Sequence, residues 1–259
     1  MNNIFAVAGV VIKELYRRKD FYVLFILTVV ICLVMASVNI YNDNEIIRYI
    51  KALCLLLIWI SSLVIAITTT ARQIPAEREQ RTLLPLLAKP LSRTQLIFGK
   101  FLGCWLACGV VLFCFYGFFG ALAASREHAW PLLNYFQAAA LHWFTLGVVI
   151  ALTLLGSLVF AAPSSNSTIC FVIVTAILCI GRYLDAVALS RTEPVRSIVW
   201  AVYYAIPHLE IPFEMRNLIV HDWPLVDWNF VALDALYLLA YAAIFLVAAC
   251  LVFRRKAVN

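Results

Sequence analysis

The amino-acid sequence predicts an all-α integral membrane protein with six transmembrane helices, folded as a single transmembrane domain over residues 1–259. Three observations lead to this fold class. Hydrophobic residues make up 64% of the chain and charged residues only 13%, which argues against a water-soluble domain. Several uncharged runs reach the ~20 residues that one membrane crossing needs. The densest block of charge and proline, residues 75–93, lies between two of these runs.

The uncharged runs place the six membrane helices at 21–41, 51–71, 99–124, 138–161, 167–184 and 230–253. The run from 129 to 181 is too long for one crossing, and the segment APSSNS at 162–167 divides it in two. We expect Ser164, Ser165 and Asn166 to form a turn that caps the fifth helix.

The segment before the first span, residues 1–20, has apolar residues near helical spacing and cations near its end. Ile4, Val7 and Val11 belong to the apolar set. This pattern predicts an N-terminal helix that lies in the membrane interface, with its cations close to anionic headgroups. The alternative is a simple extension of the first span.

The positive charges predict the orientation, because lysine and arginine favour the cytoplasmic side. The N-terminal segment, the 72–100 loop and the C-terminal tail together carry 13 basic and 4 acidic residues. The remainder of the chain carries 7 basic and 10 acidic residues. We therefore expect both termini and the 72–100 loop on the cytoplasmic side of the membrane.

An external segment at 185–229 separates the last two spans. It is apolar, rich in tryptophan and tyrosine, and interrupted by prolines, which predicts short re-entrant or interfacial helices before the sixth span. His208, Glu210, His221 and Asp222 are interpreted as polar groups at the interface. A metal site is the alternative, but their spacing matches no familiar ligand pattern, and the cysteines form no C-x-x-C pair.

Residues 72–98 form a cytoplasmic loop of unusual character. Pro75 can occupy the first turn of a helix, and Glu77 precedes Arg81 by four residues, a favourable pair on one helix face. Four leucines then form an apolar knob: Leu83, Leu84, Leu86 and Leu87. Charges around an apolar plug predict an element that docks onto a cytoplasmic partner.

The return into the third span begins after Pro90, which ends any preceding helix. Ser92 and Gln95 have the spacing of a capping box. Small residues then repeat every four positions: Gly99, Gly103 and Ala107. Such a repeat permits close helix contact, either within the protein or with a second copy.

The stretch PAEREQRTLLPLLAKPLSRTQLIFGK resembles the loop of ABC-2 type transporter permeases. In that family the stretch is the coupling helix, between the second and third spans, that passes force from an ATP-binding subunit to the membrane helices. The resemblance implies that seven residues face the ATPase: Glu77, Glu79, Arg81, Thr82, Leu83, Leu86 and Leu87. It implies that others shape the loop and its return: Pro75, Pro90, Ser92, Arg93, Gly99 and Lys100.

The resemblance also implies an exporter in the bacterial cytoplasmic (inner) membrane, built from two permease copies and separate ATPase subunits. The chain contains no G-x-x-x-x-G-K-[ST] phosphate loop, so ATP and Mg²⁺ are expected on the partner ATPase. We expect no cofactor, metal or catalytic residue in this chain, and no nucleic-acid partner.

Two other functions remain open. An intramembrane enzyme would need a nucleophile and a base, but His142 and Ser157 are 15 residues apart on one helix, about 22 Å. An ATPase-independent carrier or channel usually places charges at mid-membrane. The charges nearest to the spans, Arg182, Asp185 and Asp234, are peripheral and are interpreted as snorkelling or paired side chains. A carrier for an apolar substrate is the main alternative.

Overall fold

The structure is a computed structural model that describes residues 2–17, 19–37, 44–79, 92–127, 131–190, 192–193 and 195–255. Every element within these ranges is a helix. The helices are α1 (Asn2–Arg17), α2 (Lys19–Ser37), α3 (Asn44–Ala71), α4 (Pro75–Glu79), α6 (Arg93–Glu127), α7 (Leu132–Val159), α8 (Pro163–Ser190), α9 (Val195–Ala205), α10 (Glu210–Glu214), α11 (Asn217–Val220) and α12 (Trp228–Arg255).

Within the described part of the chain, five helical stretches are long and apolar enough to cross a membrane. They span Arg48–Glu77, Arg93–Ser125, Leu132–Val159, Pro163–Gly181 and Trp228–Arg255. They correspond to the second to sixth predicted spans. Helix α2 lies where the first span was predicted, so the count of six remains a prediction. The protein is therefore an all-helical, multi-pass membrane protein.

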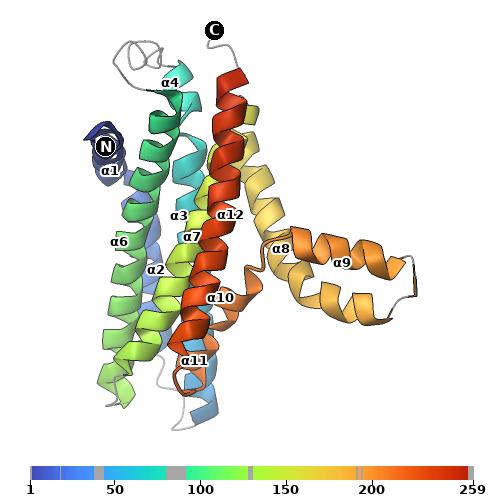
Figure 1. The fold of residues 1–259 in the computed structure, drawn as a ribbon. Coiled ribbons are helices and arrows are strands. Elements are labelled where there is room, and N and C mark those ends of the chain that lie inside the picture. Colours follow the sequence, from blue (N-terminus) through green and yellow to red (C-terminus); the bar gives the residue numbers. More distant parts are fainter. Residues whose placement is uncertain are drawn as a thin grey trace.

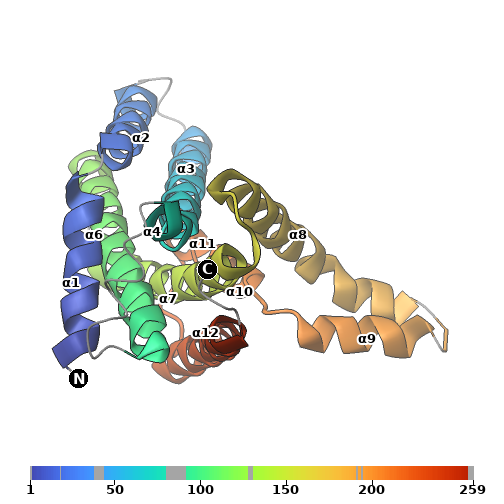
Figure 2. The same ribbon diagram turned by 90° about the horizontal axis from the view of Figure 1, so that it is seen from above.

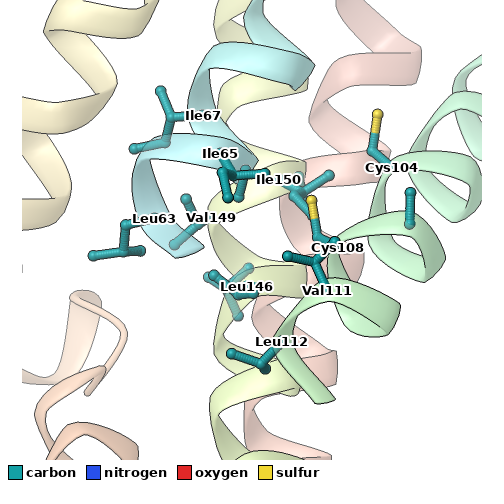
Figure 3. Close-up of a cluster of buried hydrophobic side chains, with 14 of the residues drawn as sticks. Leu63, Ile65, Ile67, Cys104, Cys108, Val111, Leu112, Leu146, Val149 and Ile150 are labelled. Carbon is teal, nitrogen blue, oxygen red and sulfur yellow. The ribbon is translucent and has the colours of Figure 1, made fainter. Parts of the chain in front are cut away.

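Helix α7 forms the centre of the bundle and packs against α3, α6, α8 and α12 (Figures 1 and 2). Its apolar span is 72% buried inside the protein, compared with 22% for α8 and 28% for α12. Figure 3 shows side chains from α3, α6 and α7 that meet in the core, among them Ile65, Leu112 and Leu146. The exposed apolar faces of α8 and α12 suit contact with lipid or another membrane helix.

Two tryptophans fasten α6 to α7. The Trp105 and Trp143 rings stack with centroids 4.5 Å apart. Each indole N–H donates to the main-chain carbonyl oxygen of the other tryptophan, at 2.9 and 3.0 Å. Gly109 and Gly147, one turn after each tryptophan, leave space for the opposite ring, because a Cβ at Gly147 would lie 3.1 Å from Trp105 Nε1. Both indole donors are thereby satisfied inside an apolar bundle.

Helix α1 lies across the bundle, since it is seen end-on in Figure 1 and lengthwise in Figure 2. It packs on α6 at the end of the bundle where α4 and the C-terminal end of α12 lie (Figure 1). A Cβ at Gly99 would lie 2.7 Å from Val7 Cβ, and one at Gly103 would lie 2.7 Å from Val11 Cβ. Gly99 and Gly103 therefore serve close packing within the protein, against α1. The alternative, contact with a second copy, is not needed to explain these two glycines.

Helix α8 is longer at both ends than the predicted 167–184. It begins at Pro163, because proline suits the first helical turn, and it continues to Ser190, because no glycine or proline follows Gly181 until Pro194. Its apolar, membrane-spanning part is Pro163–Gly181 and ends directly before Arg182. Its last turns and α9 run side by side and project from the bundle (Figures 1 and 2).

Asn166 does not cap α8, contrary to the sequence-based expectation. It lies inside the first turn of the helix and is fully buried. Its Nδ2 donates to the Thr153 carbonyl oxygen of α7 at 3.1 Å, and its Oδ1 accepts from Cys170 Sγ at 3.4 Å. Gly156 gives the carboxamide its space, since a Cβ there would overlap Asn166 Oδ1. A polar side chain therefore joins two membrane helices.

The short helices expected before the last span are α9, α10 and α11. The side chains of α11, Leu218, Ile219 and Val220, are buried against α3 and α7. The chain then returns to α12 along the first turns of α7. There Gln137 Nε2 donates to the Val226 carbonyl oxygen at 2.9 Å, and its Oε1 accepts from Val226 N at 3.3 Å. These contacts hold the segment against the bundle.

Candidate functional site

The candidate site is the corner at which α3 ends, α4 begins and α6 returns into the bundle. After α3 the chain turns through residues 72–74, with Gln73 N donating to the Thr70 carbonyl oxygen at 3.1 Å. Helix α4 begins at Pro75, as the sequence predicted. Proline fits this position because the first turn of a helix needs no intrahelical N–H donor.

A buried lysine holds this corner together. The Lys100 side chain on α6 is only 2% exposed. Its ammonium group donates to the Gln73 carbonyl oxygen at 2.9 Å, to Gln73 Oε1 at 3.3 Å and to Glu77 Oε1 at 2.7 Å. An ammonium group has three N–H donors, so all of them are satisfied. The ion pair offsets the cost of burying the lysine charge and fastens the turn and α4 to α6.

The start of α6 is fixed by two further sets of contacts. Ser92 N donates to Gln95 Oε1 at 3.0 Å and Gln95 N donates to Ser92 Oγ at 3.2 Å, which confirms the predicted capping box. Arg93 Nη1 donates to the Phe253 carbonyl oxygen at 2.8 Å. Carbonyl groups in the last turn of a helix lack intrahelical partners, so Arg93 supplies one to α12.

The residues predicted to contact a partner fall into two groups. Glu77 and Glu79 lie on α4; Glu79 is exposed, whereas Glu77 is turned toward Lys100. The remaining predicted contact residues, Arg81, Thr82, Leu83, Leu86 and Leu87, lie outside the described residues together with Pro90. The predicted Glu77–Arg81 pair stays untested, because Arg81 lies outside the described residues. Partner contact at these positions stays a prediction.

The structure brings together a second polar group that the sequence did not indicate. His142 is fully buried on α7; its Nε2 lies 2.9 Å from Ser62 Oγ of α3, and its Nδ1 lies 3.3 Å from the Tyr116 hydroxyl of α6. The Trp59 ring stacks on it at 3.9 Å. Ser157 instead donates to the Leu154 carbonyl oxygen within α7. The cluster is closed to solvent and joins three membrane helices.

The re-entrant segment extends this cluster. Phe213 of α10 meets the edge of Trp59 with ring centroids 5.0 Å apart. The Arg216 guanidinium lies over the Phe213 ring, 3.9 Å from its centroid. Burial lowers the pKa of Arg216 from its ordinary value, because removal from water disfavours the charged form. The stack connects the short helices to the interior of the bundle.

The four residues considered as metal ligands contact different partners and do not meet at one point. His208 Nδ1 lies 2.9 Å from Glu210 Oε1. His221 stacks on Trp223, and Asp222 Oδ1 accepts from Lys51 Nζ at 3.5 Å. Over the described ranges, no three histidine, cysteine or acidic side chains come close enough to hold a metal ion. Asp222 has a positive φ of 51°, and this turn brings its carboxylate toward α3.

Comparison with known families agrees with this architecture. The family model of the ABC-2 family transporter proteins matches residues 6–258. The chain belongs to the ABC-2 transporter family. It is therefore a membrane permease component of an ABC transporter, a class that works with a separate ATP-binding subunit. No curated protein matches the chain.

Proposed function

We propose that this ABC-2 permease couples ATP hydrolysis on a separate ATPase to export of a substrate, and that the ATPase docks where α4 and residues 80–91 lie. The single observation that carries the proposal is the Lys100 contact set. Because one ammonium group joins Gln73 and Glu77 to α6, we expect a displacement of α4 to be passed to α3 and α6.

The surroundings of α4 support the same use. Arg72, Arg254 and Arg255 are exposed, and α1 with its basic last turns lies at this end of the bundle (Figure 1). Basic residues mark the cytoplasmic side of a membrane protein, which is where ATP is available. In the proposed assembly both termini are cytoplasmic in a bacterial inner membrane, and two permease copies pair above two ATPases that bind ATP and Mg²⁺.

The test is co-purification of the full-length permease with the ATPase encoded beside it, followed by measurement of ATP hydrolysis. The variant Leu83→Asp with Leu86→Asp places charge on the predicted apolar plug and leaves the spans unchanged. Leu225→Asp is the control, because Leu225 is an exposed leucine in the segment before α12. We expect the double variant to lose the ATPase and the control to retain it.

Equal ATPase binding by the double variant and the unaltered chain would overturn docking at this loop. A permease that transports without any ATPase would instead establish the carrier alternative.

A further inference from the structure

The guanidinium group of Arg216 contains a buried donor without an acceptor. Arg216 lies between α10 and α11, which occupy the half of the bundle away from α4 (Figure 1). Its Nη1 atom is buried and has no hydrogen-bond partner among the described residues. The salt bridges between described residues involve other cations. A buried N–H group without an acceptor is costly, so this arginine calls for a physical explanation.

A second donor without a partner belongs to the same stack of side chains. Trp59 of α3 is 1% exposed, and its Nε1 has no acceptor among the described residues. Its ring meets the Phe213 ring with centroids 5.0 Å apart, and the Arg216 guanidinium lies 3.9 Å from the centroid of that same phenyl ring. Both side chains that adjoin Phe213 therefore carry an unmatched N–H group, one from α3 and one from the α10–α11 segment.

Hydrogen bonds around His142 hold Trp59 in one orientation. The His142 ring stacks on the indole with planes 5° apart. Ser62 Oγ donates its one proton to the Trp59 carbonyl oxygen at 2.9 Å, so it accepts from His142 Nε2. In the neutral ring, Nδ1 then accepts from the Tyr116 hydroxyl at 3.3 Å. The indole N–H takes no part in these bonds, so it is a donor that is fixed in place and still unused.

The charge of Arg216 reaches this cluster, and no acidic side chain there compensates it. The cluster side chains Trp59, Ser62, Tyr116 and His142 include no carboxylate, and the Arg216 charge acts on the Tyr116 hydroxyl. Glu214, two residues before Arg216, is exposed to water, which screens its charge. Arg216 itself is half-buried, so its outer N–H groups remain within reach of a ligand.

We propose that Arg216, with the Trp59 N–H as an inner donor, forms a binding site for an oxyanion, the phosphate or carboxylate head of an amphiphilic ligand. A planar guanidinium presents parallel N–H groups that match the oxygens of either head. Water can accept from the same donors, but it brings no negative charge to the arginine.

The position of the site favours an amphiphile. Helix α10 packs against α7 and α8, and α11 packs against α3 and α7, all of which are long enough to span a membrane. A ligand beside Arg216 is therefore within reach of the bilayer. The same head chemistry is present in a phospholipid of the bilayer and in a free anionic amphiphile. The site does not depend on ATPase docking, because the permease alone suffices for its test.

The test measures equilibrium binding of radiolabelled dodecyl phosphate to the full-length permease in dodecyl maltoside micelles, with partition into protein-free micelles subtracted. Dodecanol, which has the same chain and no charge, is the matched competitor. We expect dodecyl phosphate to bind at least about tenfold more tightly, the effect of one charge-assisted contact. Equal binding of the two compounds would overturn the proposal, and this comparison needs no variant.

Variants separate the site from the other cations of the chain. Arg216→Gln removes the charge and should weaken dodecyl phosphate binding about tenfold. Trp59→Phe keeps a ring to stack on His142 and should weaken it about fivefold. Arg196→Gln is the control, because Arg196 is an exposed arginine on α9, the helix before α10. It should leave the affinity unchanged.

Unchanged affinity in Arg216→Gln would overturn the site, and unchanged affinity in Trp59→Phe would overturn the part assigned to the indole. The thermal unfolding midpoint of each variant is measured beside its affinity. We expect Arg216→Gln to keep the midpoint of the control, so that its loss of affinity is not a loss of fold.

Added phospholipid identifies the natural source of the oxyanion. If a lipid phosphate occupies the site, phosphatidylglycerol in the micelles will weaken the part of probe binding that depends on Arg216. If the occupant is a free amphiphile, that part will be unchanged, and both results keep the site.

Discussion

The α4 end of the bundle and the start of α12 hold buried charge differently. At the α4 end, the Lys100 ammonium group has three oxygen acceptors, and each of its N–H groups is used. Near the start of α12, Asp234 Oδ2 is buried without a hydrogen-bond partner among the described residues, as are Glu210 Oε2 on α10 and, beside Lys100, Gln73 Nε2. A buried charge with several partners can fasten neighbouring helices, whereas a buried carboxylate oxygen without a donor raises the free energy of the folded state.

The tightness of packing also differs along α6. Near α4, Gly99 and Gly103 lie directly against α1, without room for a Cβ. Gly117, farther along the same helix, has open space around it, since a Cβ there would meet no atom within 4 Å. The end that we assign to ATPase coupling is thus closely fitted, and substitutions there should have the larger effects on stability.

The largest effect is expected for Lys100→Met. The substitution keeps the length of the side chain but leaves Glu77 and the Gln73 oxygens without their shared donor. Removal of one partner of a buried ion pair is strongly destabilising, so we expect a loss of about 3 kcal/mol. The thermal unfolding midpoint of the purified permease measures it, with the exposed Lys13→Met as the control. A midpoint equal to that of the control would show that the contact set carries little energy.

A smaller effect is expected from single methyl groups on α6. In Gly103→Ala the new Cβ would lie 2.7 Å from Val11 Cβ and 2.9 Å from the Ala8 carbonyl oxygen, so α1 must shift. We expect a loss of about 2 kcal/mol from overpacking. Gly117→Ala adds the same group to open space and should gain about 0.5–1 kcal/mol from helix propensity. Two variants with the same change in the unfolding midpoint would contradict the proposed close contact of α1 and α6.

Local signals made the α4 end predictable from the sequence. Pro75 begins a helix because of its own ring, and Ser92 and Gln95 cap α6 because the two residues are only three apart. The composition likewise predicts long apolar helices and their approximate positions. The loop pattern at 75–100 carries the family resemblance, and the family model confirms the ABC-2 membership.

Contacts between distant elements were not predictable in this way. The Lys100–Glu77 pair and the His142–Ser62 pair depend on how helices pack, which hydropathy does not specify. Asp234 illustrates the reason. Its position near the end of a span predicted a snorkelling or paired side chain, and the rotation of α12 turns it into the protein, where it is 7% exposed. Hydropathy gives the depth of a residue along a span, not the direction in which it faces.

The last and smallest effect has the opposite sign. Asp234→Asn removes a charge whose Oδ2 lacks a partner, so the variant should be more stable than the unaltered chain by about 1 kcal/mol in a neutral detergent. Asp227→Asn should leave the unfolding midpoint unchanged, because Asp227 is exposed and asparagine also accepts from the N–H of Asn229. A lower midpoint for Asp234→Asn would mean that the folded protein already compensates this carboxylate, and the contrast between the two ends would then disappear.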